Sequence, residues 1–252
     1  MNYTFSNTWN AYTKEVIGFI KNFKDEGKLF GDGDRNVIKL FEINNAVVNI
    51  KSFKIPNLIN QIAYRFFRKS KAQRSFEYAQ KLKSLGIGTP LPVAYFENKS
   101  SFLFKDSFYV SEHLQADLTY RELTKNLEYP NHTQILKAFT RFTFNLHENH
   151  IEFLDHSPGN TLIQLNDGDY KFFLVDLNRM NFKALSLDER IKNFARLTTN
   201  KSMVKVMSDE YAKLYGANPE EVFKKMWNYT EAFQEKFYRK KRNKKRLKFW
   251  KK

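Results

Sequence analysis

Three side chains that could support acid–base or metal chemistry follow one another closely in the segment Leu146–Met180. Asp155 is followed five residues later by Asn160, and two strand-like runs then lead to Asp176. Phosphoryl transfer needs such a set, because a base must face the acceptor hydroxyl and hard oxygen ligands must hold Mg²⁺ on the phosphates. We therefore interpret Asp155 as a candidate base and Asn160 and Asp176 as candidate Mg²⁺ ligands.

The same reaction needs a cation on the phosphates and an acid that holds this cation in place. Lys51 ends the run V-N-I-K, whose alternating pattern is typical of a strand with its apolar residues facing the core. Glu77 follows 26 residues later in a helical pattern, from which we expect it to meet Lys51 across a cleft. Taken singly, each residue has an ordinary explanation as a solvated strand end, a helix-surface charge or a capped turn. The order and spacing of the whole set are harder to produce by chance.

Periodicity and chain breakers predict the elements that would position these residues. Apolar residues at helical spacing predict three helices, at residues 7–24, 57–85 and 131–149. Alternating runs predict strands at residues 37–43, 46–53, 93–97 and 107–114, with two short strands around Asp167-Gly168. Asn44-Asn45 predicts a tight hairpin turn, and the pattern from Leu187 onward is helical. The order of strands, helix, strands and then mostly helices predicts an α+β fold.

Composition restricts the class of protein. With 252 residues, 42% hydrophobic and 16% aromatic, the chain can form a substantial core. Cysteine is absent, which excludes a disulfide framework and fits a reducing compartment. We find neither the pattern of a signal peptide at the N-terminus nor an apolar run of about 18 residues, so we expect a soluble or peripheral protein.

The net charge of +16 is concentrated at the C-terminus. Residues 236–252 contain 11 Lys or Arg and no acid, whereas the remaining 32 basic and 27 acidic residues leave +5. Such a tail, which also carries aromatic residues, suits an anionic membrane surface, a phosphorylated lipid or nucleic acid. A second basic and aromatic cluster, YRFFRKSKAQR at 64–74, is most often a solvated helix face but could grip an anionic lipid headgroup.

Three stretches together resemble the lipopolysaccharide kinases of the Kdo kinase and WaaP type, close to the Bacteroidetes branch, within the protein-kinase-like superfamily. They are KSKAQRSFEYAQKLKSLGIGTPLPVAYFE, FLDHSPGNTLIQ and FLVDLNRM. The resemblance covers roughly residues 30–200 and implies a bilobal fold with a small antiparallel N-lobe and a larger, mainly helical C-lobe. It also implies transfer of the ATP γ-phosphate to a sugar hydroxyl of lipid A–core.

The resemblance implies a role for each of the motif residues. Lys51 holds the phosphates and Glu77 pairs with it, Asp155 is the base, and Asn160 and Asp176 hold Mg²⁺. The cofactors are then ATP and Mg²⁺.

Two further contacts with ATP are expected. By analogy of fold, adenine is held at Glu112, His113 and Leu114, which end a predicted strand. Arg35 or backbone amides of the loop GDGDRN are expected to contact the phosphates, although the two aspartates of that loop would repel them.

We divide the chain accordingly into an N-lobe (1–114), a helical C-lobe (115–235) and a basic aromatic tail (236–252). Protein kinases carry His-Arg before the catalytic Asp, where this chain has Phe153 and Leu154. The chain also has Asp-Leu-Asn at 176–178 in place of Asp-Phe-Gly, and no Ala-Pro-Glu. These departures predict a short activation segment and a small acceptor in place of a protein substrate.

The expected activity is therefore an ATP-dependent kinase acting on Kdo, or on a core heptose, of lipopolysaccharide. We expect it in the cytoplasm at the inner membrane, bound to anionic lipid through its tail, with nucleic acid an unlikely partner. Two alternatives stay open on the sequence. One is another small-molecule phosphotransferase of similar fold, and the other is a non-catalytic pseudokinase or polyanion-binding module.

Overall fold

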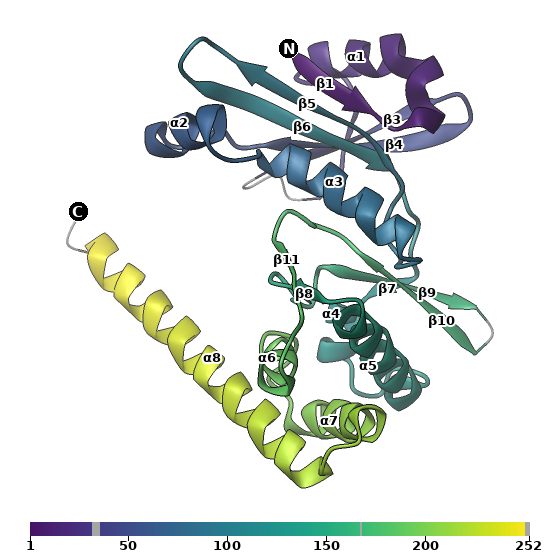
Figure 1. Cartoon of the computed structure of the whole chain (residues 1–252), viewed down its shortest axis with the longest axis vertical. Helices are drawn as coiled ribbons and strands as arrows, with labels where there is room; N and C mark the ends of the chain where they lie inside the picture. Colours follow the sequence, from purple (N-terminus) through teal and green to yellow (C-terminus); the bar gives the residue numbers. More distant parts are fainter. Residues whose placement is uncertain (32–35, 167, 250–252) are drawn as a thin grey trace. The chain divides into compact units, whose positions relative to one another are not determined.

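The computed structural model describes residues 1–31, 36–166 and 168–249, with side chains described up to Asn243. The chain forms two compact units, whose elements are labelled in Figure 1. The first comprises Met1–Gln115 and Phe173–Arg179, and the second comprises Ala116–Phe172 and the chain from Met180 onward. Residues 173–179, which carry Asp176, thus belong to the first unit although both neighbouring segments belong to the second.

The first unit is built on an antiparallel sheet in the order β1-β5-β6-β4-β3-β2. Its strands are β1 (Asn2–Phe5), β2 (Lys28–Leu29), β3 (Val37–Ile43), β4 (Ala46–Phe53), β5 (Pro92–Lys99) and β6 (Phe104–Glu112). The hairpin between β3 and β4 turns at Asn44 and Asn45, whose φ angles are 43° and 62°. A tight two-residue turn needs these positive values, which Asn tolerates, so the predicted hairpin is confirmed.

The helices of the first unit differ in detail from the predicted ones. They are η1 (Asn7–Tyr12, a 3₁₀ helix), α1 (Thr13–Lys21), α2 (Leu58–Phe66) and α3 (Lys71–Ser84). The single helix predicted over 57–85 is therefore wrong. The Ser70 side chain accepts a hydrogen bond from the Gln73 amide (3.1 Å) and starts a new helix there.

The two faces of this sheet have different partners. Val16 and Ile20 of α1 are buried in one cluster with Val48 and Ile50 of β4. Because side chains alternate along a strand, Lys51 faces the opposite side from Ile50. That opposite face is the one covered by α3, which contacts β5 and β6.

The second unit combines short strands with five helices among the described residues. Its sheets have the orders β10-β9-β7 and β11-β8. The strands are β7 (Leu118–Thr119), β8 (Ile151–Phe153), β9 (Thr161–Asn166), β10 (Asp169–Leu174) and β11 (Met180–Phe182). The helices are α4 (Tyr120–Lys125), α5 (His132–Glu148), α6 (Leu187–Lys192), α7 (Lys201–Tyr215) and α8 (Pro219–Phe249).

Phe139 of α5 lies at the centre of the second core. It is fully buried, and its ring centroid lies 4.4 Å from that of Tyr120, 5.4 Å from that of His156 and 5.7 Å from that of Phe172. The predicted helix at 131–149 is confirmed within one residue at each end. The α+β expectation is confirmed as well, since both units mix antiparallel strands with helices.

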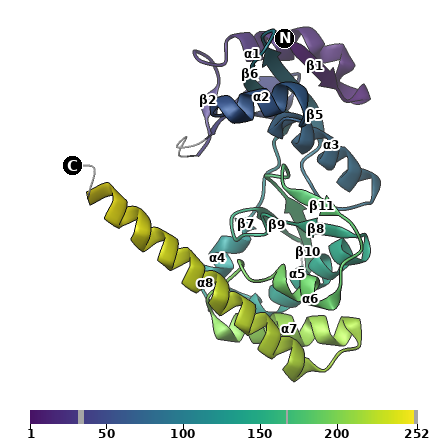
Figure 2. The same ribbon diagram turned by 60° about the vertical axis from the view of Figure 1, so that its left-hand side comes forward.

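Helix α8 includes most of the predicted basic tail. It packs against α6 and α7, where its residues Val222 and Met226 are buried. Beyond Glu235 the described side chains of α8 are exposed, and Figure 2 shows the helix continuing past the other helices of its unit. Within the described ranges, no helix combines the length and the apolar character needed to cross a bilayer.

The centre of the second core yields a first prediction. We expect Phe139→Ala to lower the free energy of unfolding by about 3–5 kcal/mol, because the substitution leaves a cavity among tightly packed rings. Urea unfolding followed by circular dichroism measures the loss. Phe237→Ala, at a half-exposed ring on α8, is the matched control and should change stability far less. A loss below about 1 kcal/mol for Phe139→Ala would contradict this packing.

The buried histidines of this unit make its stability depend on pH. Burial lowers the pKa of His147 to about 4 and that of His156 to about 3. In the unfolded chain both pKa values lie near 6.5, so the unfolded state binds more protons below that pH. The contribution of the two histidines to the free energy of unfolding should therefore be fully present above about pH 6.5. It should be lost as pH falls toward 4, by up to about 1.4 kcal/mol per pH unit for each histidine.

Urea titrations at several pH values between 7.5 and 5 measure this slope. His147→Gln should reduce it by roughly one proton equivalent. His150→Asn, at an exposed position, should leave the slope unchanged. Equal slopes for the wild type and His147→Gln would show that His147 does not cause the pH dependence.

Candidate active site

The first part of the candidate site joins Lys51 of β4 to Asp176. The Lys51 Nζ lies 2.8 Å from the Asp176 Oδ1, although the two residues are 125 positions apart in the chain. The Lys51 ammonium also lies 5.4 Å from the ring centroid of Phe53 on the same strand. With 14% and 30% of their side chains exposed, the two charges are only partly shielded from water.

Backbone contacts hold Asp176 in this position. Just before it, the Leu174 amide donates to the Gly88 carbonyl (2.9 Å), and the Thr89 hydroxyl donates to the Leu174 carbonyl (2.9 Å). Asp176 itself has a φ of 59°, an unusual value for a residue with a side chain. Its Oδ1 accepts a second bond from the Asn178 side-chain amide (2.7 Å). The carboxylate is thus fixed by a strained backbone and by two donors.

Glu77 does not pair with Lys51, so that predicted contact is wrong in this structure. The Glu77 carboxylate accepts hydrogen bonds from the Lys69 ammonium (2.8 and 3.0 Å) and from the Gln73 amide (3.0 Å). Gln73 is one helical turn earlier on α3, where i and i+4 side chains meet, and Lys69 precedes the same helix. These local donors occupy the carboxylate, while Lys51 is paired with Asp176.

The predicted adenine segment lies at the end of β6, where most of its polar groups are used within the protein. The Glu112 amide donates to the Leu91 carbonyl (2.9 Å), and the His113 amide donates to the Val47 carbonyl (2.8 Å). The Glu112 carboxylate accepts from the Trp9 indole (3.1 Å). Two predicted contacts with ATP remain. Leu114, predicted for adenine, is the last residue of this segment, and Arg35, predicted for the phosphates, lies outside the described residues.

The second unit carries two further candidate residues, Asp155 and Asn160, in the loop after β8. The Asn160 amide donates to the Ser157 carbonyl (2.9 Å), closing a turn. The Asn160 side-chain Nδ2 donates to the Asp155 carbonyl (2.8 Å), so the two predicted residues are brought together. Because this bond uses the donor side of the amide, the oxygen is the group that Asn160 can offer to a cation.

Arg196 contacts the candidate base, a role that sequence reasoning missed. Its Nη1 lies 2.8 Å from the Asp155 Oδ1 and donates to the Leu154 carbonyl at 3.0 Å. The guanidinium also lies 5.5 Å from the ring centroid of Phe233 on α8. No motif in the sequence marks this arginine, which follows α6 at a position 41 residues after Asp155.

A buried layer beneath the loop supports it. The His156 ring lies against those of Phe139, Phe153 and Phe194, and burial keeps it neutral by lowering its pKa to about 3. The Asn193 side-chain amide donates to the Phe153 carbonyl (2.9 Å). The backbone before Asp155 is therefore held by the Asn193 amide and by Arg196, and the residue after Asp155 is a buried, neutral histidine.

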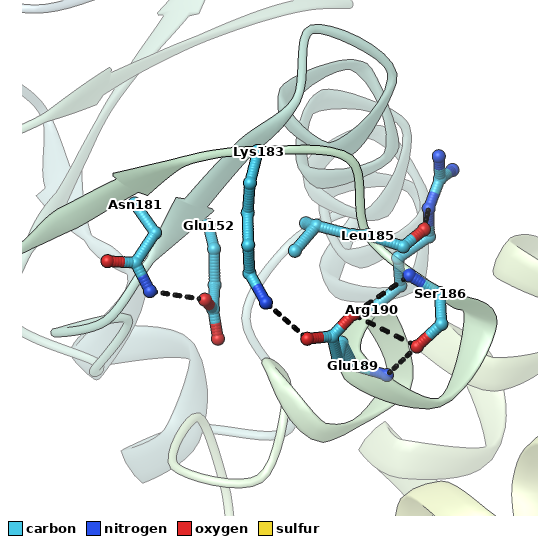
Figure 3. Close-up of polar contacts among 7 residues, drawn as sticks. All are labelled: Glu152, Asn181, Lys183, Leu185, Ser186, Glu189 and Arg190. Carbon is cyan, nitrogen blue, oxygen red and sulfur yellow. Dashed lines mark hydrogen bonds and ion pairs between the residues drawn. The ribbon is translucent and has the colours of Figure 1, made fainter.

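The segment between β11 and α6 is short, and Figure 3 shows its polar contacts. Lys183 pairs with Glu189, which also forms a reciprocal capping box with Ser186. Arg190 pairs with Glu148 and donates to the Leu185 carbonyl. The two cations drawn there are thus paired with acids of the same unit, as expected for a segment that does not depend on an added phosphate for order.

Each unit contributes a side chain of a kind that suits Mg²⁺. Asp176 in the first unit offers a carboxylate, and Asn160 in the second unit offers an amide oxygen; both are hard ligands. Among the described residues, no group of three or more His, Cys, Asp or Glu side chains forms a ready-made metal cage.

Comparisons with known proteins agree with this chemistry. No curated protein sequence matches the chain. A solved structure described as WaaP in complex with acyl carrier protein has a similar fold, with a TM-score of 0.65 at 16% identity, over 94% of this chain and 100% of the other. The model of the lipopolysaccharide kinase (Kdo/WaaP) family matches residues 55–218, more than half of the chain. The match includes Glu77, Asp155, Asn160 and Asp176, and the chain belongs to the lipopolysaccharide kinase (Kdo/WaaP) family.

Proposed function

We propose that this chain is an ATP- and Mg²⁺-dependent kinase that phosphorylates a sugar hydroxyl of lipid A–core, with Kdo as the first acceptor and a core heptose as the second. The observation that carries the proposal is the 2.8 Å contact between Lys51 and Asp176. In this proposal Lys51 is the cation that binds phosphate and Asp176 is a carboxylate that binds the metal, and phosphoryl transfer requires such groups side by side. Membership of the family supports the same reaction class.

Each residue has a distinct task in this proposal. Asp155 accepts the proton of the sugar hydroxyl as that oxygen bonds to the γ-phosphorus and the bond from this phosphorus to the bridging oxygen breaks, so that ADP leaves. Arg196 orients the Asp155 carboxylate. Lys51 neutralises charge on the phosphates. Asn160 and Asp176 would hold Mg²⁺, which when bound offsets the charge that develops on the transferred group.

The contacts of Lys51 suggest how it is kept ready. Asp176 is the partner of the Lys51 ammonium, whereas the sequence predicts Glu77 in that role. A lysine paired with a metal-binding carboxylate can exchange that partner for phosphate oxygens when nucleotide and metal arrive together. In this proposal Glu77 accepts hydrogen bonds from Lys69 and Gln73 at the start of α3 and makes no contact with ATP.

We place the enzyme at the cytoplasmic face of the inner membrane. Support comes from the exposed basic end of α8 and from the 11 basic residues of the segment 236–252. Basic residues near an anionic leaflet contribute on the order of 1 kcal/mol each at moderate salt. A lipid-linked acceptor would be found at that surface.

Removing the base tests the reaction. We expect Asp155→Asn to lower kcat with Kdo–lipid A by about 10²–10⁴-fold, because the hydroxyl proton loses its acceptor. Mass spectrometry of the lipid product together with ADP release measures the loss. Asp169→Asn, at an exposed strand residue, is the matched control and should keep full activity. Wild-type turnover of a free aminoglycoside in place of the lipid would contradict the acceptor, and undiminished activity of Asp155→Asn would contradict the assigned base.

Removing the metal ligand tests nucleotide binding separately. Saturating Mg-ATP should stabilise the wild type by about 2.7 kcal/mol at a hundredfold excess over its Kd. We expect Asp176→Ala to abolish this Mg²⁺-dependent stabilisation in thermal unfolding, with Asp169→Ala unchanged. Asp176→Asn, which keeps the side-chain shape, guards against a simple folding defect. Absence of any Mg-ATP shift in the wild type would reject the enzyme and leave a non-catalytic binding protein.

A further inference from the structure

Helix α2 presents large apolar side chains to solvent. None of its residues is buried, and Leu58, Ile59, Ile62 and Phe66 are all exposed, Ile59 to 78%. At 3.6 residues per turn these four side chains lie within an arc of about 100°. They form one continuous row, which we call the α2 stripe. A stripe of this width normally faces a core, yet here it faces away from one.

Contacts opposite the stripe and at its edge fix this orientation. The ring of Tyr64 packs against that of Phe104 in β6, with centroids 5.6 Å apart. The Arg65 Nε donates to the Ser100 carbonyl (3.0 Å) at the tip of the β5–β6 hairpin. Tyr64 and Arg65 thus attach the helix to the sheet of its own unit. The outward position of the α2 stripe follows from these contacts.

Two exposed phenylalanines extend the apolar surface. Phe67 follows the last residue of α2 and is 81% exposed. Phe102 is 75% exposed and lies two residues after Ser100, whose carbonyl accepts the bond from Arg65. Most of the surface of both side chains is therefore open to solvent.

The chain segment that contains the stripe carries charge of a single sign. Between Glu42 and Glu77 the chain has no acidic residue and seven basic ones. The Arg65 guanidinium lies 5.1 Å from the ring centroid of Phe66, and that of Arg68 lies 5.9 Å from the ring centroid of Tyr64. Lys54 and Lys71 line a cavity of about 420 Å³ beside the N-terminal end of α2. Apolar side chains bordered by cations match a layer whose acyl chains lie beneath anionic headgroups.

We propose that α2 is a membrane-docking helix, which lies in the interface of an anionic bilayer with its stripe, Phe67 and Phe102 inserted among the acyl chains. Arg65 and Arg68 then meet the lipid phosphates from the rim of the stripe. This contact is separate from the basic end of α8, and it does not depend on phosphoryl transfer. Projecting side chains favour a bilayer over an acidic protein, which would need a groove shaped to receive them.

The absence of cysteine allows a direct test on the full-length chain. A single cysteine at Ile59, labelled with an environment-sensitive fluorophore, should shift to the blue with vesicles of phosphatidylcholine and phosphatidylglycerol. Spin-labelled lipids in those vesicles should quench it. The same label at Leu127, an exposed residue of the second unit, is the control and should respond to neither.

Substitution gives a second readout. We expect Ile59→Ser/Phe67→Ser to weaken vesicle binding about tenfold in 0.5 M salt, where the attraction of exposed basic residues is screened. Leu29→Ser/Leu127→Ser removes two exposed apolar side chains elsewhere and should bind like the wild type. These substitutions are at exposed positions, and circular dichroism checks that each variant is folded.

The outcomes separate this proposal from the kinase assignment, because the vesicles contain neither ATP nor a sugar acceptor. A label at Ile59 that ignores vesicles, or equal binding by the two double variants, overturns the docking role of α2. A label that shifts with an acidic acyl carrier protein but not with vesicles overturns it in favour of a protein partner. Vesicle insertion in a chain that shows no kinase activity would support α2 docking and reject only the enzymatic function.

Discussion

The ion pair between Lys51 and Asp176 is the contact on which the rest of the site depends. The ion pair attaches a segment of seven residues, 173–179, to the first unit, although the chain before and after that segment belongs to the second. The two bonds between residues 88–89 and Leu174 make this attachment specific, and the positive φ of Asp176 turns its carboxylate toward the lysine. Lys51 and Asp176, assigned to phosphate and metal, are therefore carried by the first unit, whereas Asp155 and the other candidate metal ligand, Asn160, are carried by the second.

The second unit supports its candidate base without the His-Arg pair of protein kinases. Phe153 takes the histidine position and is buried, and a neutral histidine follows the base and lies among aromatic rings. The cation near the base comes from Arg196, far along the chain. With its charge balanced locally and its backbone held by Asn193, Asp155 needs no covalent modification elsewhere to become ordered. This arrangement of the base does not require a signalling step.

Local patterns predicted the elements of the fold well, and they marked the loop that carries Asp155 and Asn160, because these signals are short-range. The β3–β4 hairpin, α5, and the pairing of Asp155 with Asn160 all follow from spacing within a few residues. The partners of charged side chains could not be predicted in the same way. Glu77 is bound by Lys69 and Gln73, whereas Lys51 is bound by Asp176, and only tertiary packing decides these partners. Arg196 meets its aspartate only after α6 and the β8 loop have assembled, and no periodicity encodes that approach.

The contact of Arg196 with Phe233 sets a limit on how the protein can be shortened. The arginine that holds Asp155 lies over a ring on α8, so part of this C-terminal helix belongs to the environment of the base. A fragment designed for crystallisation that ends before Phe233 would remove that support, even though it kept every residue of the catalytic motifs. A fragment that ends at Glu235 would retain it while removing the highly charged end. A fragment that keeps the support of Asp155 must therefore end inside α8, more than fifty residues after the last sequence motif.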